Sequence, residues 1–534
     1  MKTSDGAHLT VRGRLWRLAL PSLVAGVAIA LSLPPWGWWP LALVGSALLY
    51  WRLRGLRPGG RLLAGWLAGL GCYVPGLWWA RSFNWYGAAV LMAVEALFMG
   101  VAAVLVPPRR GRLLAYPAAF TLLEALRMAW PFGGLPIGGA FLGQAGGPLL
   151  GTARIGGPLL VTALVWLAGA ALAELALRWS PPRPIVAPVA AGLVVVVLSV
   201  LAVGAPDGGP VTRWVRVAAV QGGGRRGTSA EEVDGAAVYS AELAATATVT
   251  HAGSGRRPSL VVWPEDVISL GRPLAGSPEA ATLAGLARQL RATVLAGVTE
   301  PAPGNAFSNL MVAWGPRGRV VGTYQKVHRV PFGEYVPYRS FFAHFASLAG
   351  VPLTAVPGHG DGLLRTPVGP LGVMVSYEVF FADRGRAPVA AGARLLVVPT
   401  NTSSYSATQV PAQEVAADRV QAVAEGRTLV QAAPTGYSTF VTPAGAVTQR
   451  SVLGRRQVLV GSVALRSGRT LYALTGDLPV LVVAGAALVA GWVVSGRRRG
   501  REGDGEASDG EGTGPEGVPG AKELAGQEAA APVG

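Results

Sequence analysis

The chain has 534 residues, of which 51% are hydrophobic and only 14% are charged, and its formal net charge is +17. Soluble globular proteins carry about 25% charged residues, so this composition excludes an ordinary cytosolic enzyme and a disordered protein. The 74 glycines and 41 prolines follow no G-X-Y period, which excludes collagen. The single cysteine, Cys72, excludes an internal disulfide, and the five histidines show no metal-site spacing.

Seven apolar runs fill the first 204 residues, and an eighth follows near the C-terminus. A spanning helix needs about 20 apolar residues, so eight runs with few internal charges predict a polytopic α-helical membrane protein. The first run does not resemble a cleaved signal peptide, because further spans follow it at once and it lacks a small-residue cleavage site. The expected spans are 18–33, 38–51, 62–80, 86–106, 113–130, 155–177, 185–203 and 474–494.

Arginine and lysine alternate between the loops that join these spans. Basic clusters occur before the first span and after the second, fourth, sixth and eighth, whereas the other loops carry few basic residues. Because basic loops are retained in the cytoplasm, this pattern places residues 1–17 and 495–534 inside and residues 213–468 outside the cell. The seven-helix domain then covers 18–204. The basic residues lie in short clusters between apolar runs and not along one basic face. This distribution favours a bilayer as partner and does not indicate nucleic acid.

Two acidic residues, Glu95 and Glu124, fall within expected spans. An intramembrane carboxylate is a functional candidate by default, but each of these two also suits a simple helix-to-helix contact. The segment 502–534 has almost no large apolar side chains, so we expect the cytoplasmic end of the chain to be a disordered acidic tail.

Residues 213–468 show short β-rich runs that alternate with helical stretches, a pattern typical of a layered α/β domain with its own core. Several of the strands are near-continuous apolar runs, which indicates that both faces of the sheet are covered. Expected strands are 214–221, 259–263, 293–298, 309–314, 320–324, 372–376, 395–399, 428–432 and 439–442, and expected helices are 231–249, 278–290 and 409–425.

Polar residues follow three of these strands, at positions where packing does not require them. The run SLVVWPED places Glu265 after a strand, and RVVGTYQKVHRVPFGEYVP places Lys326 after another, with Glu334 eight residues later. The run LGVMVSYEVFF ends a third strand at Ser376. Since α/β folds carry their chemistry on loops at strand ends, these residues are candidates for one site.

These motifs, in this order, resemble the carbon–nitrogen hydrolase (nitrilase) superfamily. Seven spans, an outside domain with W-P-E, Y-x-K-x-x-x-V-P-F-G-E-Y-V-P and Y-E motifs, and one closing span resemble the bacterial apolipoprotein N-acyltransferase family. The resemblance covers about residues 15–495. It implies an extracytoplasmic α-β-β-α sandwich and a multi-pass location in the bacterial cytoplasmic membrane. The sequence has no P-loop, no G-x-G-x-x-G after a strand and no H-E-x-x-H, so we expect no metal or other cofactor.

The resemblance also implies roles for individual residues. Glu265 corresponds to the general base and acid, and Lys326 to the group that stabilises the developing oxyanion, aided by a backbone N–H near Tyr377. Glu334 and Glu378 correspond to supporting carboxylates that orient Lys326 and its loops. Asn309 is a further candidate for holding the site.

The chain departs from the family at the nucleophile, because Ser376 stands where the family usually has cysteine. A hydroxyl is far less ionised than a thiol at neutral pH, so this serine depends on an adjacent base such as Glu265. Two interpretations remain open: a working serine variant, and a catalytically silent scaffold that binds lipoproteins or another envelope enzyme. Cys72 is expected inside the third span and cannot substitute.

The implied reaction is a two-step acyl transfer. A phospholipid donates a fatty acyl group to the nucleophile, and the N-terminal α-amine of a diacylglyceryl-cysteine lipoprotein then accepts it. A membrane-tethered amidase that passes the acyl group to water is an alternative, and so is a serine hydrolase with His328 or His359 as its base. The apolar segment 341–356 suits a lid or a membrane-dipping arm, and ordinary core packing is the alternative.

Overall fold

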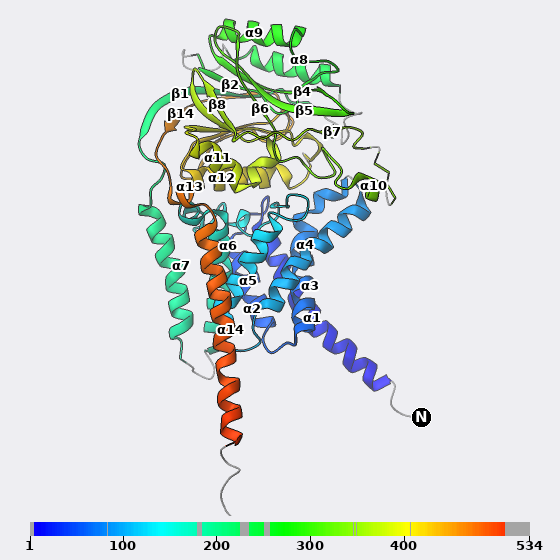
Figure 1. Ribbon diagram of the computed structural model, residues 1–534, viewed down its shortest axis with the longest axis vertical. Coiled ribbons are helices and arrows are strands. Elements are labelled where there is room, and N and C mark those ends of the chain that lie inside the picture. The colour runs from blue at the N-terminus through cyan, green and yellow to red at the C-terminus, as the bar shows by residue number, and fades with distance from the viewer. Residues whose placement is uncertain are drawn as a thin grey trace, which may run out of the picture.

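The computed structural model of the chain describes residues 5–82, 84–178, 184–224, 234–249, 257–344, 347–348, 350–405 and 407–507. Within these ranges, side chains are described from residue 18 to residue 496. A bundle of apolar helices forms one part of the molecule, and a domain of two β-sheets between helical layers lies at one end of it (Figure 1).

Each of the eight apolar runs of the sequence coincides with a helix of the bundle. Among the described residues, four helices are long and apolar enough to cross a membrane: Trp85–Leu105, Leu150–Arg178, Val186–Gly204 and Leu478–Gly496. The membrane character is therefore supported, while the number of spans stays a prediction. The bundle consists of α1 (Asp5–Ser32), α2 (Pro40–Arg52), α3 (Pro58–Gly76), α4 (Trp85–Leu105), α5 (Arg112–Arg127), α6 (Ala153–Arg178), α7 (Val186–Gly204) and α14 (Leu478–Ala507).

The last helix runs further than the sequence predicts. α14 continues to Ala507, past the expected end at residue 494. The predicted tail beyond residue 507 lies outside the described residues.

Small residues allow the bundle helices to approach one another closely. A Cβ atom built on Gly69 of α3 would lie 2.5 Å from Ala96 Cα of α4, and one on Gly26 of α1 would lie 1.9 Å from the Ala68 carbonyl oxygen. Close backbone contact through glycine is typical of helices that pack within lipid. By contrast, α7 and α14 present valines to the outside: Val203 is 81% exposed and Val483 is 67% exposed. Such apolar outer surfaces suit a bilayer environment.

The other part of the chain forms two sheets. Described residues give an eight-stranded sheet in the order β14-β1-β2-β4-β5-β6, with β3 and β7 beside β4 and β5, and a six-stranded sheet in the order β13-β12-β11-β10-β9-β8. The first sheet contains β1 (Val211–Gln221), β2 (Leu260–Val262), β3 (Ile268–Ser269), β4 (Thr293–Ala302), β5 (Ala306–Trp314), β6 (Val320–Gln325), β7 (Thr354–Ala355) and β14 (Gln457–Arg466). The second contains β8 (Leu363–Thr366), β9 (Gly369–Val373), β10 (Leu395–Pro399), β11 (Leu429–Ala432), β12 (Thr439–Val441) and β13 (Val447–Arg450).

Helices cover the outer face of each sheet, which produces the predicted α-β-β-α sandwich (Figure 1). In β1, Val217 and Ala219 face the core between the sheets, while Ala218 and Val220 pack under the helices. This alternation explains why both sets of positions in the strand are apolar. The helices are α8 (Gly235–Thr246) and α9 (Pro278–Leu290) on the first sheet, and α11 (Ala382–Ala390) and α12 (Val410–Glu425) on the second.

Several elements were not predicted or end elsewhere. β14 was not predicted, because its outer half is only partly buried and its apolar pattern is interrupted by Gly461 and Ser462. The strand expected at 372–376 ends at Val373, since Ser376 adopts a left-handed backbone with φ 51°. The helix expected at 231–249 is described as α8, and residues 231–233 lie outside the described residues.

The segment 341–356 differs between its two ends, and its contact with a membrane stays a prediction. The short helix α10 (Arg339–Phe342) precedes its middle, where residues 345, 346 and 349 lie outside the described residues. Phe341 is 57% exposed, whereas Ala355 is buried in β7 and pairs with Phe307 of β5. The end of the segment is therefore core, and its beginning is surface.

The two ends of the sandwich domain lie next to each other. β1 and β14 pair antiparallel along their length, and Val211 at the start of β1 is opposite Arg466 at the end of β14. The Arg466 guanidinium also forms an ion pair of 2.8 Å with Asp207, in the link from α7. The chain then returns to the bundle through α13 (Leu471–Thr475) and α14.

The sandwich rests on the bundle through its second helical layer. Residues of α11 and α12 share one buried apolar cluster with residues of the bundle helices. Polar contacts join the same surfaces: Gln413 of α12 donates to the Gly76 carbonyl of α3 and accepts from the Gly138 N–H. The two parts are thus packed as one body.

Candidate active site

The three strand ends singled out in the sequence converge near the boundary with the bundle. Glu265 follows β2, Lys326 follows β6, and Ser376 follows β9. Glu265 sits on a tight turn: a Cβ atom on Gly297 of β4 would lie 2.4 Å from the Pro264 carbonyl oxygen, so the turn packs directly on this glycine.

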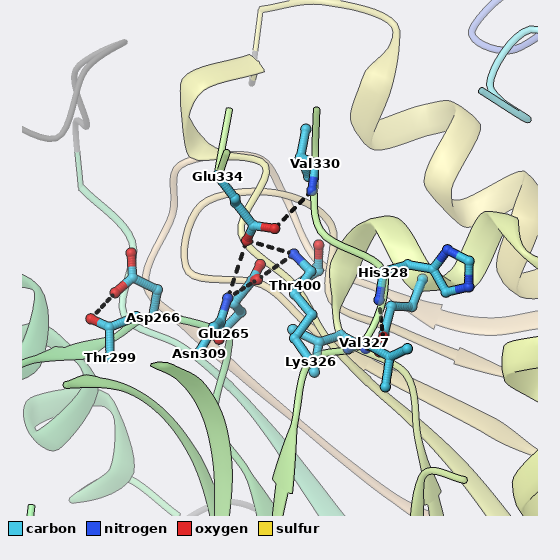
Figure 2. A network of polar contacts seen from close by, with 12 residues as sticks. Glu265, Asp266, Thr299, Asn309, Lys326, Val327, His328, Val330, Glu334 and Thr400 are labelled. Carbon is cyan, nitrogen blue, oxygen red and sulfur yellow. Dashed lines mark hydrogen bonds and ion pairs between the residues drawn. The ribbon is translucent and has the colours of Figure 1, made fainter. Parts of the chain in front are cut away.

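Lys326 is the centre of a buried polar network (Figure 2). Its Nζ lies 2.9 Å from Glu265 Oε1 and 2.8 Å from Glu334 Oε1. Asn309 of β5 donates from Nδ2 to the same two oxygens, at 2.8 Å and 3.2 Å. The second oxygen of Glu334 accepts from the Val330 N–H at 2.8 Å, which fixes that carboxylate.

Burial shifts the pKa values of the charged groups in this network, since Lys326 is only 2% exposed and Glu265 only 4% exposed. Burial raises the pKa of Glu265 above that of an ordinary carboxyl; Lys326 opposes the shift and the negative charge of Glu334 adds to it. Burial alone would lower the pKa of Lys326, but the two carboxylates more than offset this effect, so its pKa is raised. The amine therefore stays an ammonium, while Glu265 is poised to accept a proton.

Glu378 frames the loops around the network without bonding the Lys326 amine. Its Oε1 accepts from the backbone N–H groups of Val327 and His328 at 2.7 Å and 3.0 Å, and its Oε2 accepts from the Val375 N–H at 2.8 Å. The Tyr324 hydroxyl donates to the same carboxylate at 2.9 Å. One carboxylate thus ties the segment after Lys326 to the segment before Ser376.

Ser376 stands at the start of a short 3-10 turn, Ser376–Phe380, with left-handed backbone geometry. A non-glycine residue in this region is strained, and strained residues cluster at functional sites. The side chain of Ser376 is partly exposed, and no hydrogen bond joins it to Glu265 or Lys326 among the described residues. Its neighbour Tyr377 is buried and donates its hydroxyl to the Gly134 carbonyl of the bundle at 2.8 Å.

Neither of the two histidines considered as a base bonds Glu265, Lys326 or Ser376 in the described part of the chain. The His328 ring stacks on Phe381 at 4.2 Å between centroids, its Nε2 lies 3.7 Å from Asp383, and Figure 2 shows the ring turned away from Lys326. His359 is exposed on a loop. Neither position favours the hypothesis of a histidine base.

Sequence reasoning missed three residues near the network. Thr400, at the end of β10, donates its hydroxyl to the buried Glu414 of α12, whose other oxygen has no partner among the described residues. Burial raises the pKa of Glu414 to about 8. Burial also raises the pKa of Tyr405, which packs edge-on against Trp79 with ring centroids 5.4 Å apart. None of the three stands in a recognisable motif, and the sequence shows only that Glu414 lies in the helix predicted at 409–425.

Cys72 is buried in α3, within the bundle, as expected. Across the part of the chain that the structure describes, no group of three or more His, Cys, Asp or Glu side chains is arranged to hold a metal ion.

Comparison with protein-family models agrees with this architecture. The family model of the apolipoprotein N-acyltransferase N-terminal domain matches residues 25–171, and the carbon-nitrogen hydrolase model matches residues 216–472. Among solved structures, the chain is similar to a carbon-nitrogen hydrolase from Helicobacter pylori G27, with 16% identity, a TM-score of 0.38, and coverage of 50% of this chain and 95% of that one.

Full-length relatives extend the match across both parts. The chain is 32% identical to the apolipoprotein N-acyltransferase of Mycolicibacterium smegmatis over 501 residues, which cover 87% of this chain and 83% of the relative. It is 30% identical to that of Azotobacter vinelandii over 531 residues, which cover 92% and 98%. On this similarity, the chain belongs to the apolipoprotein N-acyltransferase family.

Proposed function

We propose that this protein N-acylates lipoproteins through an acyl-enzyme on Ser376. A membrane phospholipid is the acyl donor, and the N-terminal α-amine of a diacylglyceryl-cysteine lipoprotein is the acceptor. The observation that carries the proposal is the buried network of Lys326 with Glu265 and Glu334, in a domain that rests on a bundle of apolar helices. Both substrates are anchored in lipid, so a site at the end of such a bundle suits them.

In the first step, the Ser376 hydroxyl attacks the carbonyl carbon of a phospholipid ester, and Glu265 takes the hydroxyl proton. The raised pKa of Glu265 suits a group that must accept and return a proton. The Lys326 ammonium stabilises the negative charge on the carbonyl oxygen, aided by the Tyr377 N–H. The ester bond to glycerol breaks, and the lysophospholipid oxygen leaves with the proton from Glu265.

In the second step, the lipoprotein amine attacks the Ser376 ester and loses a proton to Glu265. The ester bond breaks, the Ser376 oxygen recovers that proton, and the new amide leaves. Glu334 keeps the Lys326 ammonium in place during both steps, and Asn309 and Glu378 hold the surrounding carboxylate and loops. These are positioning roles, since none of the three residues needs to exchange a proton.

We also propose that all eight apolar helices span the cytoplasmic membrane, with the sandwich on the extracytoplasmic side. The alternation of basic loops supports this orientation. Lipoproteins receive their acyl groups at the outer surface in this arrangement, where the acceptor amine is free.

The test is mass spectrometry of the purified protein after incubation with phospholipid and no acceptor. We expect an acyl mass on the peptide that contains Ser376 and no such mass in Ser376→Ala. Ser240→Ala is the matched control, because Ser240 lies exposed on α8, in the outer helical layer of the first sheet. Normal N-acylation by Ser376→Ala would refute the proposal.

The serine itself favours a second candidate, a catalytically silent scaffold that binds lipoproteins. Under that alternative the folded, lipid-bound protein forms no adduct at residue 376, although it still binds a diacylated lipopeptide. Release of free fatty acid without amide formation would instead indicate a membrane-tethered hydrolase.

A further inference from the structure

A fully buried arginine lies at the end of α5, inside the helix bundle. The Arg127 side chain is 0% exposed and forms ion pairs of 3.0 Å with Glu95 of α4 and 2.8 Å with Glu124 of α5. Its guanidinium also lies over the Tyr73 ring of α3, 5.1 Å from the centroid. The two acidic residues noted within the expected spans therefore share one cation.

Arg127 does more than neutralise these carboxylates. Its guanidinium nitrogens also donate to the carbonyls of Leu135, Pro136 and Ile137, in the loop that follows α5. A planar guanidinium with five donors can serve two carboxylates and several carbonyls at once, which an ammonium cannot. We therefore expect the path of the loop to depend on this one side chain.

The backbone of this loop adopts an unusual conformation that contacts from elsewhere must stabilise. Phe132, Gly133 and Gly134 all have positive φ, at 56°, 93° and 87°. At Gly134 a Cβ atom would lie 2.1 Å from the Met128 carbonyl oxygen, so the loop folds tightly back on the end of α5. Phe132 is strained in this conformation, and outside contacts must hold it there.

The same loop meets the candidate active site at two points. The Gly134 carbonyl accepts the Tyr377 hydroxyl at 2.8 Å, directly beside Ser376. The Phe132 carbonyl accepts the Tyr335 hydroxyl at 3.0 Å, directly beside Glu334. One loop of the bundle thus contacts the neighbours of both the proposed nucleophile and the lysine-holding carboxylate.

We propose that Arg127 is a positioning residue for the acyl transfer. Held by Glu95 and Glu124, it fixes the loop 132–137, and this loop fixes the backbone at Ser376 and Glu334 through the two tyrosine hydroxyls. The inference deepens the proposed function, because it concerns the same site. The alternative is a purely local role, in which Arg127 only joins α4 to α5.

The principal variant is Arg127→Lys in the full-length protein, which keeps the positive charge between the carboxylates and loses the fork that holds the loop. Arg178→Lys is the matched control: Arg178 pairs with Glu174 of α6 at 3.0 Å and bonds no residue of the loop. The readouts are N-acylation of a diacylated lipopeptide with phosphatidylethanolamine vesicles as donor, and amide hydrogen exchange of the peptide that spans residues 374–380.

We expect Arg127→Lys to lower kcat by about tenfold or more, because small misplacement of reacting groups has effects of this size, while KM for phospholipid stays within about threefold. Exchange at residues 374–380 should rise in Arg127→Lys and stay unchanged in Arg178→Lys. Adding Tyr377→Phe to Arg127→Lys should lower kcat by a smaller factor than Tyr377→Phe does in the unaltered protein. Both changes interrupt the same connection between Arg127 and Tyr377.

Equal hydrogen exchange at residues 374–380 in Arg127→Lys and Arg178→Lys would overturn the inference. So would a double variant in which the factors by which Arg127→Lys and Tyr377→Phe each lower kcat simply multiply. If Arg127→Lys does not fold, Tyr377→Phe decides, because full wild-type kcat in that variant would show that the loop contact has no role. Hydrogen exchange needs no turnover, so this inference can fail while the proposed function stands, and the reverse.

Discussion

At the scale of single residues, the arrangement around Lys326 places two carboxylates on one ammonium. Burial raises the pKa of Glu265, and the negative charge of Glu334 adds to that shift. Glu334 is less buried and accepts an additional hydrogen bond from the Val330 N–H. This asymmetry in burial and hydrogen bonding favours Glu265 as the carboxylate that exchanges a proton.

The asymmetry predicts the pH dependence of acyl transfer. Because Glu334 raises the pKa of Glu265, Glu334→Gln should lower that pKa and move the acid limb of the rate profile to lower pH. The maximal rate should fall as well, since Lys326 loses a partner at 2.8 Å. Rates of N-acylation between pH 4 and pH 9 would show both effects.

Glu279→Gln serves as the control for this profile, because Glu279 pairs with Arg272 on the surface of α9 and does not reach the site. Its acid limb should coincide with that of the unaltered protein. An acid limb that moves to higher pH in Glu334→Gln would contradict the role given to Glu265.

The nucleophile yields a second prediction at this scale. Ser376→Cys should form the acyl-enzyme at least as fast as the serine protein, because a thiolate is more accessible at neutral pH and a thioester is more reactive towards amines. Parallel assays of adduct formation and N-acylation would measure this. Activity in Ser376→Cys with none in the unaltered chain would indicate the silent scaffold.

At the scale of elements, α12 carries a buried carboxylate at an unfavourable place. Glu425 is the last residue of the helix, is fully buried, and has no hydrogen-bond partner on either oxygen among the described residues. Burial raises its pKa from 4.5 to about 8, with Arg427 opposing. A negative charge near a helix C-terminus is also unfavourable to the helix dipole.

The raised pKa links stability to pH. Between pH 4.5 and about 8 the unfolded chain has lost the Glu425 proton and the folded chain has kept it, so this residue destabilises the fold increasingly as pH rises and no further above pH 8. Glu425→Gln removes the effect. Its gain in Tm should be small at pH 5 and largest above pH 8, at roughly 2–4 °C per kcal/mol recovered.

Thermal unfolding of detergent-solubilised protein at both pH values would check this, with Glu279→Gln as the exposed comparison. The pKa of Glu279 is lowered by its own backbone N–H and by Arg272, so its neutralisation should not produce the same trend. A gain for Glu425→Gln that is equal at pH 5 and pH 8.5 would exclude a buried, neutral Glu425.

What the sequence reveals about elements depends on how local the signal is. The helix at 278–290 and the strand at 395–399 are long apolar or periodic runs, and the structure has them at the same positions. β14 depends on pairing with β1, which lies some 250 residues earlier, so its own residues carry little indication of it. The hydrogen bond from the Tyr377 hydroxyl to the Gly134 carbonyl cannot be predicted from the sequence either. The two residues are 243 positions apart, so no local pattern indicates the contact.

The candidate site was foreseeable in its charged members and not in its surroundings. Glu265, Lys326 and Glu334 stand after strands in recognisable motifs, and the structure brings them together. Thr400 and Glu414 have no such motif, since a buried carboxylate on an apolar helix face reads as one more helical residue. Their proximity depends on how α12 packs on the second sheet, against β11 and β12.

At the scale of the whole molecule, the joint core between the bundle and the sandwich predicts a fixed orientation in the membrane. The lone, buried Cys72 makes this testable, because the chain is almost a cysteine-free background. Ala275→Cys lies on an exposed part of the sandwich, and Arg110→Cys on the exposed loop between α4 and α5. On intact cells, a membrane-impermeant maleimide should label Ala275→Cys and leave Arg110→Cys unlabelled.

Both variants should react once the cells are lysed, which controls for thiol accessibility. The unaltered protein should remain unlabelled in intact and lysed cells alike, since Cys72 is buried in α3. Labelling of Arg110→Cys in intact cells would reverse the proposed topology.

The neighbouring ends of the sandwich have a consequence for how such a molecule can be assembled. Val211 and Arg466 face each other, and Arg466 reaches Asp207 in the preceding link, so the whole sandwich leaves and rejoins the bundle at one spot. A domain whose ends adjoin can be spliced into a host chain at a single loop without a long tether. The sandwich is therefore an insertion between α7 and α14 of the bundle. A short linker that joins residue 207 directly to residue 466 would replace it.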